Sequence, residues 1–425
     1  MKKLISFLFT LLLLVISTEN TIPELAVVFH IGLGALQWSI VFMFVMLTSI
    51  IVMASVLSTT TLKNQMSISY YSLFSMIGIL TIAIGTALCN DVDFSFSVAW
   101  QIITFFMVVI LMGFYREIIL WVDLKSVRTS VVLYSFANAV LGILQAIMNQ
   151  AFLPVTDSNG KNTVYSVFVI RNALQSYTSD YFVPGTKIRA FGLLMSGDRL
   201  GLLVLFALIL VLFYSRDWNI FVRWALSATY IVAIYYTNVR TIMVMSVVAI
   251  ALYVYRSKWK KLNTLVFNLG ILFQVFVVIS QQIVVNWLTS VANIPYLKNV
   301  FSRLSGVEYF MNYYDVYSLK ALAFGFLYQA DGNVWKTTSY TVDNQFLSLF
   351  LNFGLIFTVL VYLTYSKVYT NMFVKNDVRG FSTFFAVLMV GGISLISFSF
   401  MNSLLIIGML MSGKFEKLNA QVIDQ

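Results

Sequence analysis

Two arginines, Arg189 and Arg240, have the chemistry to bind a phosphate, and each lies beside a long apolar segment. A guanidinium is planar, stays charged at every relevant pH and donates paired hydrogen bonds to two oxygens of one phosphate. Arg240 lies in a very short turn between two apolar runs, together with Asn238. If both arginines face one cavity, they form a clamp for a pyrophosphate, with Asn238 as a further substrate contact. The alternative is that Arg240 only extends to the membrane interface.

Arg189 begins a segment that is too polar for a membrane interior and that ends at Asp198 and Arg199. We expect this segment to lead into an apolar span from outside the membrane, with Arg199 as a further substrate-binding candidate. The alternative is an ion pair between Asp198 and Arg199 that leaves Arg189 at the interface.

Asp343 and Asn344 stand at the start of another apolar run. In the functional interpretation, Asp343 lies near the arginines, where it activates a hydroxyl or positions a substrate that Asn344 also contacts. In the structural alternative, Asp343 is the N-cap of a helix and Asn344 lies in its first turn, where polar groups are favoured. The two interpretations are compatible.

A polar, aromatic-rich segment covers residues 286–342. Long loops in compact proteins are usually functional. Aromatic faces with neighbouring carboxylates suit sugar rings, which stack by one face and form hydrogen bonds at their edges. The alternative is an aromatic belt on an amphipathic helix at the membrane surface. The candidate sugar contacts are Glu308, Tyr313, Tyr314, Asp315 and Trp335.

The elements that position these residues are membrane helices. The chain has 425 residues, of which 60% are hydrophobic and only 10% charged, whereas a soluble domain carries about 25% charged residues. Backbone groups in lipid must bond within the protein, so the spans are helical. We expect an all-α polytopic membrane protein, with residues 1–425 as one membrane domain. About twelve transmembrane helices are expected, at 1–16, 35–57, 68–88, 94–115, 130–148, 200–214, 218–236, 241–255, 262–285, 344–365, 381–398 and 401–411.

The charged residues predict the orientation of these helices. When the connecting segments are assigned alternately to two sides, 17 of the 27 Lys and Arg residues fall on the side that holds both termini. The positive-inside rule then places the termini in the cytoplasm and the two long loops, 150–189 and 286–342, outside. This distribution accounts for the net charge of +10 without a nucleic-acid partner. With one cysteine and one histidine, an intramolecular disulfide and a multi-histidine or multi-cysteine metal site are excluded.

Three features in this order resemble the O-antigen polymerase (Wzy) and O-antigen ligase superfamily. They are an external Arg-x-x-Gly motif at Arg189, an arginine at the turn between the next two spans at Arg240, and a large external loop that ends in Asp-Asn-x-aromatic-Leu. The last motif starts at Asp343 and is followed by a helix with an internal glycine, Gly354. Ligases usually keep a histidine where this chain has Asp343, so the resemblance favours a polymerase.

The resemblance implies a C-type glycosyltransferase-like fold and a reaction without metal or cofactor in the bacterial cytoplasmic membrane. The polymerase would transfer a glycan from undecaprenyl pyrophosphate to the non-reducing end of another lipid-linked repeat unit of a surface polysaccharide. Arg189 and Arg240 would neutralise the leaving pyrophosphate, and Asp343 would act as base or position the acceptor. Expected partners are membrane lipid, a chain-length regulator and a flippase.

Two other functions remain open. A polysaccharide flippase or exporter would also have about twelve spans and arginines, but with short, even loops and charges held at mid-membrane. An O-antigen ligase would differ from the polymerase in its acceptor.

Overall fold

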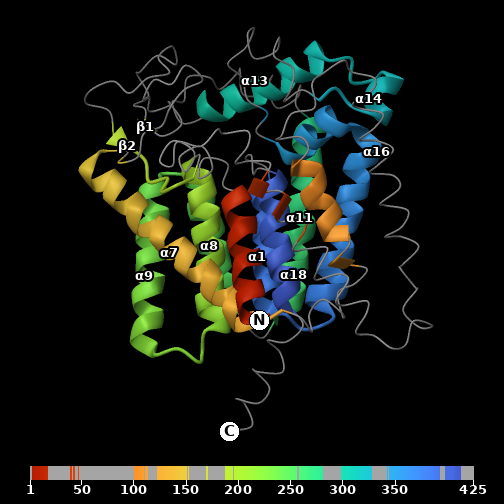
Figure 1. Cartoon of the computed structure of the whole chain (residues 1–425). Helices are drawn as coiled ribbons and strands as arrows, with labels where there is room; N and C mark the ends of the chain where they lie inside the picture. The colour runs from red at the N-terminus through yellow and green to blue at the C-terminus, as the bar shows by residue number, and fades with distance from the viewer. Residues whose placement is uncertain are drawn as a thin grey trace, which may run out of the picture. The chain divides into compact units, whose positions relative to one another are not determined.

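The computed structural model describes most of the helical part of the chain. Described are residues 2–17, 100–109, 122–150, 169–170, 187–194, 196–255, 258–280, 298–327, 344–392 and 398–412, with the short or single positions 39–40, 42–43, 46, 111–112, 152 and 342. These residues are almost entirely helical (Figure 1). The chain divides into two compact units, one of Met1–Thr60, Arg116–Val254 and Ile407–Gln425, the other of Thr61–Tyr115 and Tyr255–Ile406.

The first unit is built around a helix that is buried on all sides. This helix, α8 (Gly197–Tyr214), is hydrophobic around its whole circumference after its first turn, as expected of a helix enclosed by others. It packs against α7 (Leu124–Met148), α9 (Ile220–Thr237) and α10 (Arg240–Val254), and α7 also packs against α1 (Lys2–Ser17). A short antiparallel ladder pairs β1 (Val169–Ile170) with β2 (Lys187–Ile188).

The ends of these helices follow from capping residues. Asp123 caps the start of α7 by accepting a hydrogen bond from the Ser126 N–H (3.1 Å), and Asn219 caps α9 by accepting from Phe221 N–H (2.9 Å). Asn149 and Asn238 end α7 and α9 in the left-handed conformation, with φ of 55° and 51°. Asparagine tolerates this conformation better than most residues. The helices therefore begin and end at residues whose side chains favour those positions.

The second unit contains α11 (Trp259–Ile279), α13 (Lys298–Tyr313), α14 (Leu319–Ala323), α16 (Gln345–Lys367) with a π-helical continuation η4 (Val368–Val374), α17 (Arg379–Gly391) and the first part of α18 (Phe398–Ser412). Its closest helix pair is α11 with α17, where a Cβ on Gly270 would lie 2.7 Å from the Met389 carbonyl carbon. Asn263 donates a hydrogen bond to the Thr383 hydroxyl (3.0 Å) across the same interface.

Helix α16 is broken at Gly354, which has φ 85° and ψ 168°. Just before this break, the carbonyls of Leu351 and Asn352 accept hydrogen bonds from the N–H groups of Phe326 (2.7 Å) and Leu327 (3.2 Å). A Cβ on Gly325 would lie 2.5 Å from the Gly354 nitrogen. Glycine is therefore required on both sides of this contact.

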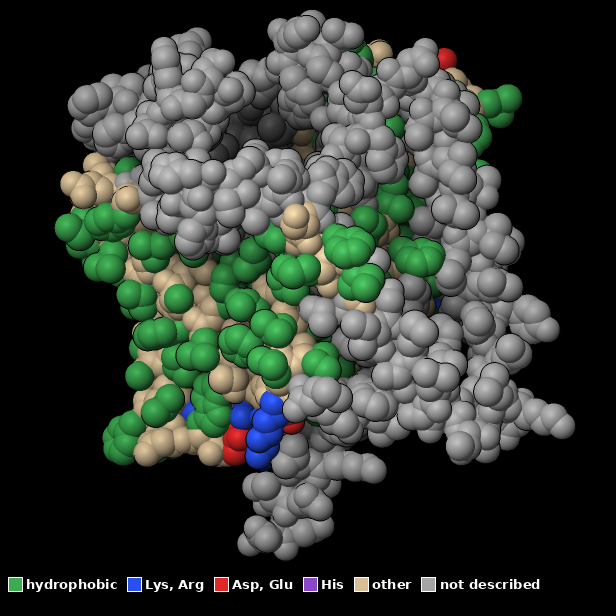
Figure 2. All heavy atoms as spheres, in the orientation of Figure 1, with side chains coloured by type: hydrophobic (Ala, Val, Ile, Leu, Met, Phe, Trp, Pro, Cys, Tyr) green, Lys and Arg blue, Asp and Glu red, His purple; other side chains and the backbone are tan. Residues whose placement is uncertain are grey.

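The structure confirms that the described part of the chain is built of helices, several of which could cross a membrane. Five helices among the described residues are long and apolar enough to cross a membrane: Leu124–Met148, Gly197–Tyr214, Ile220–Thr237, Trp259–Ile279 and Gln345–Val374. Each of them falls on a predicted span, and shorter apolar helices match several others. Figure 2 shows a broad hydrophobic surface over the described helices, with most visible charged side chains near helix ends. The count of twelve and the glycosyltransferase-like fold stay predictions, and the spans expected at 35–57 and 68–88 lie largely or wholly outside the described residues.

Candidate functional site

The two predicted arginines lie at the same end of the first unit. The Ala190 N–H, next to Arg189, donates to the carbonyl of Tyr236 in the last turn of α9 (3.0 Å). Gly197, the first residue of α8, is so close to this turn that a Cβ there would lie 3.0 Å from the Thr237 carbonyl oxygen. Since α10 starts at Arg240 just after that turn, the segment that carries Arg189 and the starts of α8 and α10 meet at one place. We call this the arginine end, defined by Arg189, Arg199, Asn238 and Arg240.

Polar side chains of α7 hold the segment that follows Arg189. Gln145 accepts a hydrogen bond from the Gly192 N–H (2.8 Å) and donates one to the Gly192 carbonyl (2.9 Å). Asn138 accepts from Leu193 N–H (2.8 Å), and Asn149 accepts from Ile188 N–H (2.7 Å). Gln145 and Asn138 are almost completely buried, so these bonds are shielded from water. The segment beside Arg189 is therefore fixed and not a free loop.

The backbone conformation explains why the Arg-x-x-Gly motif ends in glycine. Gly192 has φ 63°, and a Cβ at this position would lie 2.8 Å from both the backbone and the side-chain oxygen of Asn138. Only glycine combines a left-handed backbone with so close an approach. The motif thus joins a residue with phosphate-binding chemistry, Arg189, to a residue that fixes the turn against α7.

The electrostatics of the arginine end favour an anion. The N–H groups in the first turns of α8 and α10 add partial positive charge, and Ser196 before α8 makes no side-chain cap. Arg240 is exposed and has no hydrogen bond or ion pair with any residue that the structure describes. Arg189 and Arg199 are half-buried, and Asp198 contributes the one acidic side chain in the first turn of α8. This arrangement can bind a phosphate or another anionic group.

The remaining predicted site residues belong to the second unit. Asn344 is 1% exposed and is the N-cap of α16, since it accepts a hydrogen bond from Leu347 N–H (3.0 Å). Its amide also donates to the Gln274 carbonyl of α11 (3.0 Å). The N-cap is therefore Asn344, and the expectation that Asp343 caps this helix is wrong. Asp343 and Trp335 lie outside the described residues.

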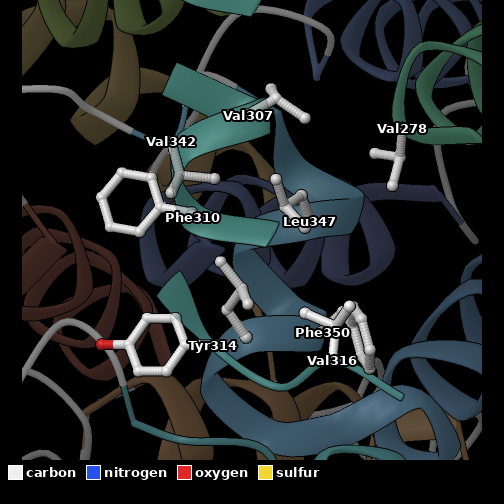
Figure 3. Close-up of a cluster of buried hydrophobic side chains, with 9 residues drawn as sticks. Val278, Val307, Phe310, Tyr314, Val316, Val342, Leu347 and Phe350 are labelled. Atoms are coloured by element: carbon white, nitrogen blue, oxygen red, sulfur yellow. The ribbon is translucent and has the colours of Figure 1, made fainter. Parts of the chain in front are cut away.

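The long segment before α16 is partly a packed helix. Val307, Phe310 and Tyr314 of α13 and the turn after it share a hydrophobic cluster with residues of α16 (Figure 3). Tyr314 is 8% exposed, and its ring stacks on Phe326 with centroids 4.7 Å apart. Its ring faces are therefore used in packing, and we do not carry it into the sugar-binding proposal. Glu308 is half-buried, and Tyr313 and Asp315 are exposed.

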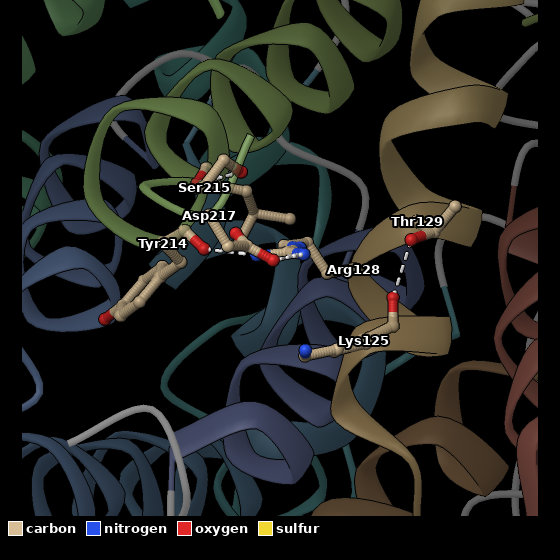
Figure 4. A network of polar contacts seen from close by, with 7 residues as sticks. Lys125, Arg128, Thr129, Tyr214, Ser215 and Asp217 are labelled. Carbon is tan, nitrogen blue, oxygen red and sulfur yellow. Dashed lines mark hydrogen bonds and ion pairs between the residues drawn. The ribbon is translucent and has the colours of Figure 1, made fainter. Parts of the chain in front are cut away.

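An ion pair at the opposite end of the first unit was not predicted. Arg128 of α7 is 3% exposed and donates to both carboxylate oxygens of Asp217, with distances of 2.6 and 2.7 Å (Figure 4). It also donates to the Tyr214 carbonyl (2.5 Å), and its guanidinium lies 4.8 Å from the centroid of the Trp218 ring. The hydrogen bonds from Arg128 lower the pKa of Asp217 below its ordinary value. The sequence did indicate that this ion pair could form, because Arg128 and Asp217 both fall at the same predicted membrane face.

A buried polar centre in the second unit was also missed. Gln274 lies within an apolar helix and is 1% exposed. Its side chain donates to the Met389 carbonyl (2.6 Å) and accepts from the Tyr362 hydroxyl (2.5 Å), so it joins α11, α16 and α17. A lone glutamine in an apolar run was the signal that could have indicated it. Because both the nitrogen and the oxygen of the Gln274 amide are hydrogen-bonded, this centre fixes how the three helices pack.

Neither the described residues nor the comparisons with known proteins add a cofactor or a family. No group of three or more His, Cys, Asp or Glu side chains that could share a metal ion occurs in the part of the chain that the structure describes. No family model, no curated protein and no solved structure matches the chain.

Proposed function

We propose that this protein polymerises the repeat units of a surface polysaccharide at the outer face of a bacterial cytoplasmic membrane. The donor is a glycan on undecaprenyl pyrophosphate, and the acceptor is the non-reducing end of another lipid-linked repeat unit. The observation that supports the proposal is the arginine end, where the backbone beside Arg189 bonds to the last turn of α9 and α10 starts at Arg240 just after that turn. The order of the three sequence motifs supports the same class of enzyme.

The reaction requires electrostatic stabilisation of the leaving pyrophosphate. A hydroxyl oxygen of the acceptor attacks the anomeric carbon, the bond from that carbon to the pyrophosphate oxygen breaks, and the hydroxyl proton passes to a base. The leaving undecaprenyl pyrophosphate gains negative charge as the bond breaks. Arginine side chains and helix N-termini stabilise such developing charge, which is often the largest single contribution to catalysis. Arg189 and Arg240 take this role, and Asp343 is our candidate for the base.

A flippase is the second candidate, because moving a lipid pyrophosphate also requires cationic side chains. Its binding charges are expected near the middle of the membrane. Arg240 instead lies at the start of α10, and Arg189 lies in the segment after β2 that bonds to the last turn of α9. This position favours a reaction at one membrane face over transport through the bilayer. A ligase would use the same arginines and differ in its acceptor.

The test uses the purified full-length protein in lipid, with a synthetic undecaprenyl-pyrophosphate repeat unit as the only substrate. We expect a ladder of longer glycans from the wild type. Arg240→Ala and Arg189→Ala should slow ladder formation by about 10²–10³-fold, as removal of a transition-state contact typically does. Arg216→Ala is the matched control, because Arg216 is exposed and lies just after the other end of α8. Transfer of the lipid-linked unit across the bilayer without a ladder would instead establish the flippase.

A further inference from the structure

The outward side of α13 and the turn after it carries an aromatic and acidic surface that the proposed function has not used. We call it the tyrosine face. It consists of Glu308, Asn312, Tyr313, Asp315 and Tyr317, and Tyr309 lies behind it, partly packed against the buried cluster of α13 and α16.

Helix geometry puts most of these residues on one side. Residues four apart on a helix are neighbours, so Tyr309 stands next to Tyr313 and Glu308 next to Asn312. The rings of Tyr309 and Tyr313 stack with centroids 5.8 Å apart and planes at 22°. Tyr313 is 44% exposed, and Tyr317 in the following turn is 86% exposed. The result is a row of aromatic surface bordered by carboxylate and amide groups.

The opposite side of α13 makes this surface rigid. Val307, Phe310 and Tyr314 are buried against α16, at the end where α16 begins (Figures 1 and 3). The Val316 N–H and the Ser318 N–H bond to backbone carbonyls within the turn, at 2.8 and 3.1 Å. An aromatic surface on a fixed support loses little conformational entropy when it binds a ligand.

The charges select among possible ligands. The tyrosine face includes Glu308 and Asp315 but no Lys, Arg or His, and the two basic residues of α13, Lys298 and Arg303, lie in the first two turns of that helix. An acidic surface repels phosphate groups, so anionic lipid headgroups and the pyrophosphate of a lipid-linked sugar are disfavoured, and surface-binding helices are typically rich in Lys and Arg. Sugar rings fit, because their C–H faces pack on aromatic rings while their hydroxyls donate to carboxylates and amides.

We propose that the tyrosine face binds the glycan portion of the lipid-linked chain, through sugar rings that carry free hydroxyls. This proposal rests on the proposed function for the identity of the glycan.

The experiment measures glycan binding separately from phosphate binding. The full-length protein in nanodiscs is titrated with lipid-free oligosaccharides released by mild acid from the surface polysaccharide of the cells that make this protein, with saturation-transfer NMR as the readout. We expect binding to the wild type and a loss of about three- to tenfold in affinity for each of Tyr313→Ala and Tyr317→Ala. Tyr313→Trp should restore binding. Tyr255→Ala, at a tyrosine that is 65% exposed beyond the end of α10, should leave it unchanged.

A second titration separates this proposal from the proposed function. Sugar-free undecaprenyl pyrophosphate should bind the tyrosine variants as tightly as the wild type and should bind Arg240→Ala more weakly. The proposal that the tyrosine face binds glycan would be overturned if the oligosaccharide does not bind the wild type. It would also be overturned if Tyr313→Ala and Tyr317→Ala bind the oligosaccharide as tightly as the wild type. Either result counts independently of how the lipid pyrophosphate binds. Tyrosine variants that instead lose affinity for vesicles of phosphatidylglycerol and phosphatidylethanolamine would assign this surface to the membrane. Failure of the lipid pyrophosphate alone to bind would count against the proposed function only.

Discussion

The two ends of the first unit hold arginines in opposite environments. At one end, Arg128 is almost fully buried and donates to Asp217, to the Tyr214 carbonyl and toward the face of Trp218. At the other end, Arg240 is exposed, and no residue in the described ranges forms an ion pair or hydrogen bond with it. Arg128 therefore has a structural role, since it links α7 to the segment after α8, whereas Arg240 is accessible to an anionic ligand.

The difference shows why the presence of an arginine near a membrane is weak evidence for function. A buried guanidinium must be neutralised by the protein itself, because its charge is costly away from water. An exposed guanidinium at the start of a helix keeps its hydration and can exchange it for an anionic ligand. The presence of a bonding partner, and not the position in the sequence, separates the roles of Arg128 and Arg240.

The largest expected effect is the loss of activity in Arg240→Ala. Because Arg240 is exposed and has no hydrogen bond or ion pair with any described residue, its removal should leave the free energy of unfolding within about 0.5 kcal/mol of the wild type. The rate of glycan extension should fall by about 10²–10³-fold. Both quantities are measured on the same preparation. A large loss of stability in Arg240→Ala would show that Arg240 has a structural role, as Arg128 does.

The next effect is on stability at the opposite end. Asp217→Ala leaves the buried Arg128 without its carboxylate, and we expect a loss of about 3 kcal/mol in the free energy of unfolding. Arg128→Met removes the buried charge and should cost less, because Asp217 is partly exposed and can be solvated. Unfolding by denaturant in detergent compares the two variants. If Arg128→Met proves the more damaging change, the account of this pair is wrong.

A smaller effect is expected from Gly192→Ala. The added Cβ meets Asn138 at 2.8 Å, and the backbone there has φ 63°. We expect a loss of about 1–3 kcal/mol in stability, together with a weaker affinity for sugar-free undecaprenyl pyrophosphate because the segment after Arg189 shifts. Gly142→Ala is a useful comparison, since a Cβ there meets mainly the flexible side-chain end of Leu200. If Gly192→Ala binds the lipid as tightly as the wild type, the turn at Gly192 does not position the phosphate-binding residues of the arginine end.

The smallest effect is the pH dependence of the Arg128–Asp217 pair. The pKa of Asp217 in the folded protein lies below its ordinary value of 3.8, so the unfolded chain binds the proton more readily. The stability that the pair contributes should be complete above about pH 4 and should be lost as the pH falls through the lowered pKa. Unfolding of the wild type and of Asp217→Asn, measured between pH 3 and pH 6, tests this. The difference between them should shrink only at the acidic end of that range.

The helices could be predicted from the sequence because hydrophobic length alone decides them. The span predicted at 200–214 corresponds to Gly197–Tyr214 and the one at 241–255 to Arg240–Val254. The polar contacts within and between helices could not be predicted in this way. Gln145 and Gln274 each lie in an apolar helix, and what they bond to depends on how the helices pack. Asn344 was expected in the first turn of its helix and is the cap, because the cap depends on the backbone angles of one residue.

The central claim is that the arginine end binds the phosphate part of a lipid-linked substrate. The most direct measurement is the affinity of sugar-free undecaprenyl pyrophosphate for the full-length protein in nanodiscs, compared among the wild type, Arg240→Ala, Arg240→Lys and the control Arg216→Ala. Our account predicts a loss of about tenfold or more in Arg240→Ala, an intermediate loss in Arg240→Lys because an ammonium lacks the paired donors of a guanidinium, and no change in Arg216→Ala. Equal affinity in Arg240→Ala and Arg216→Ala would contradict it.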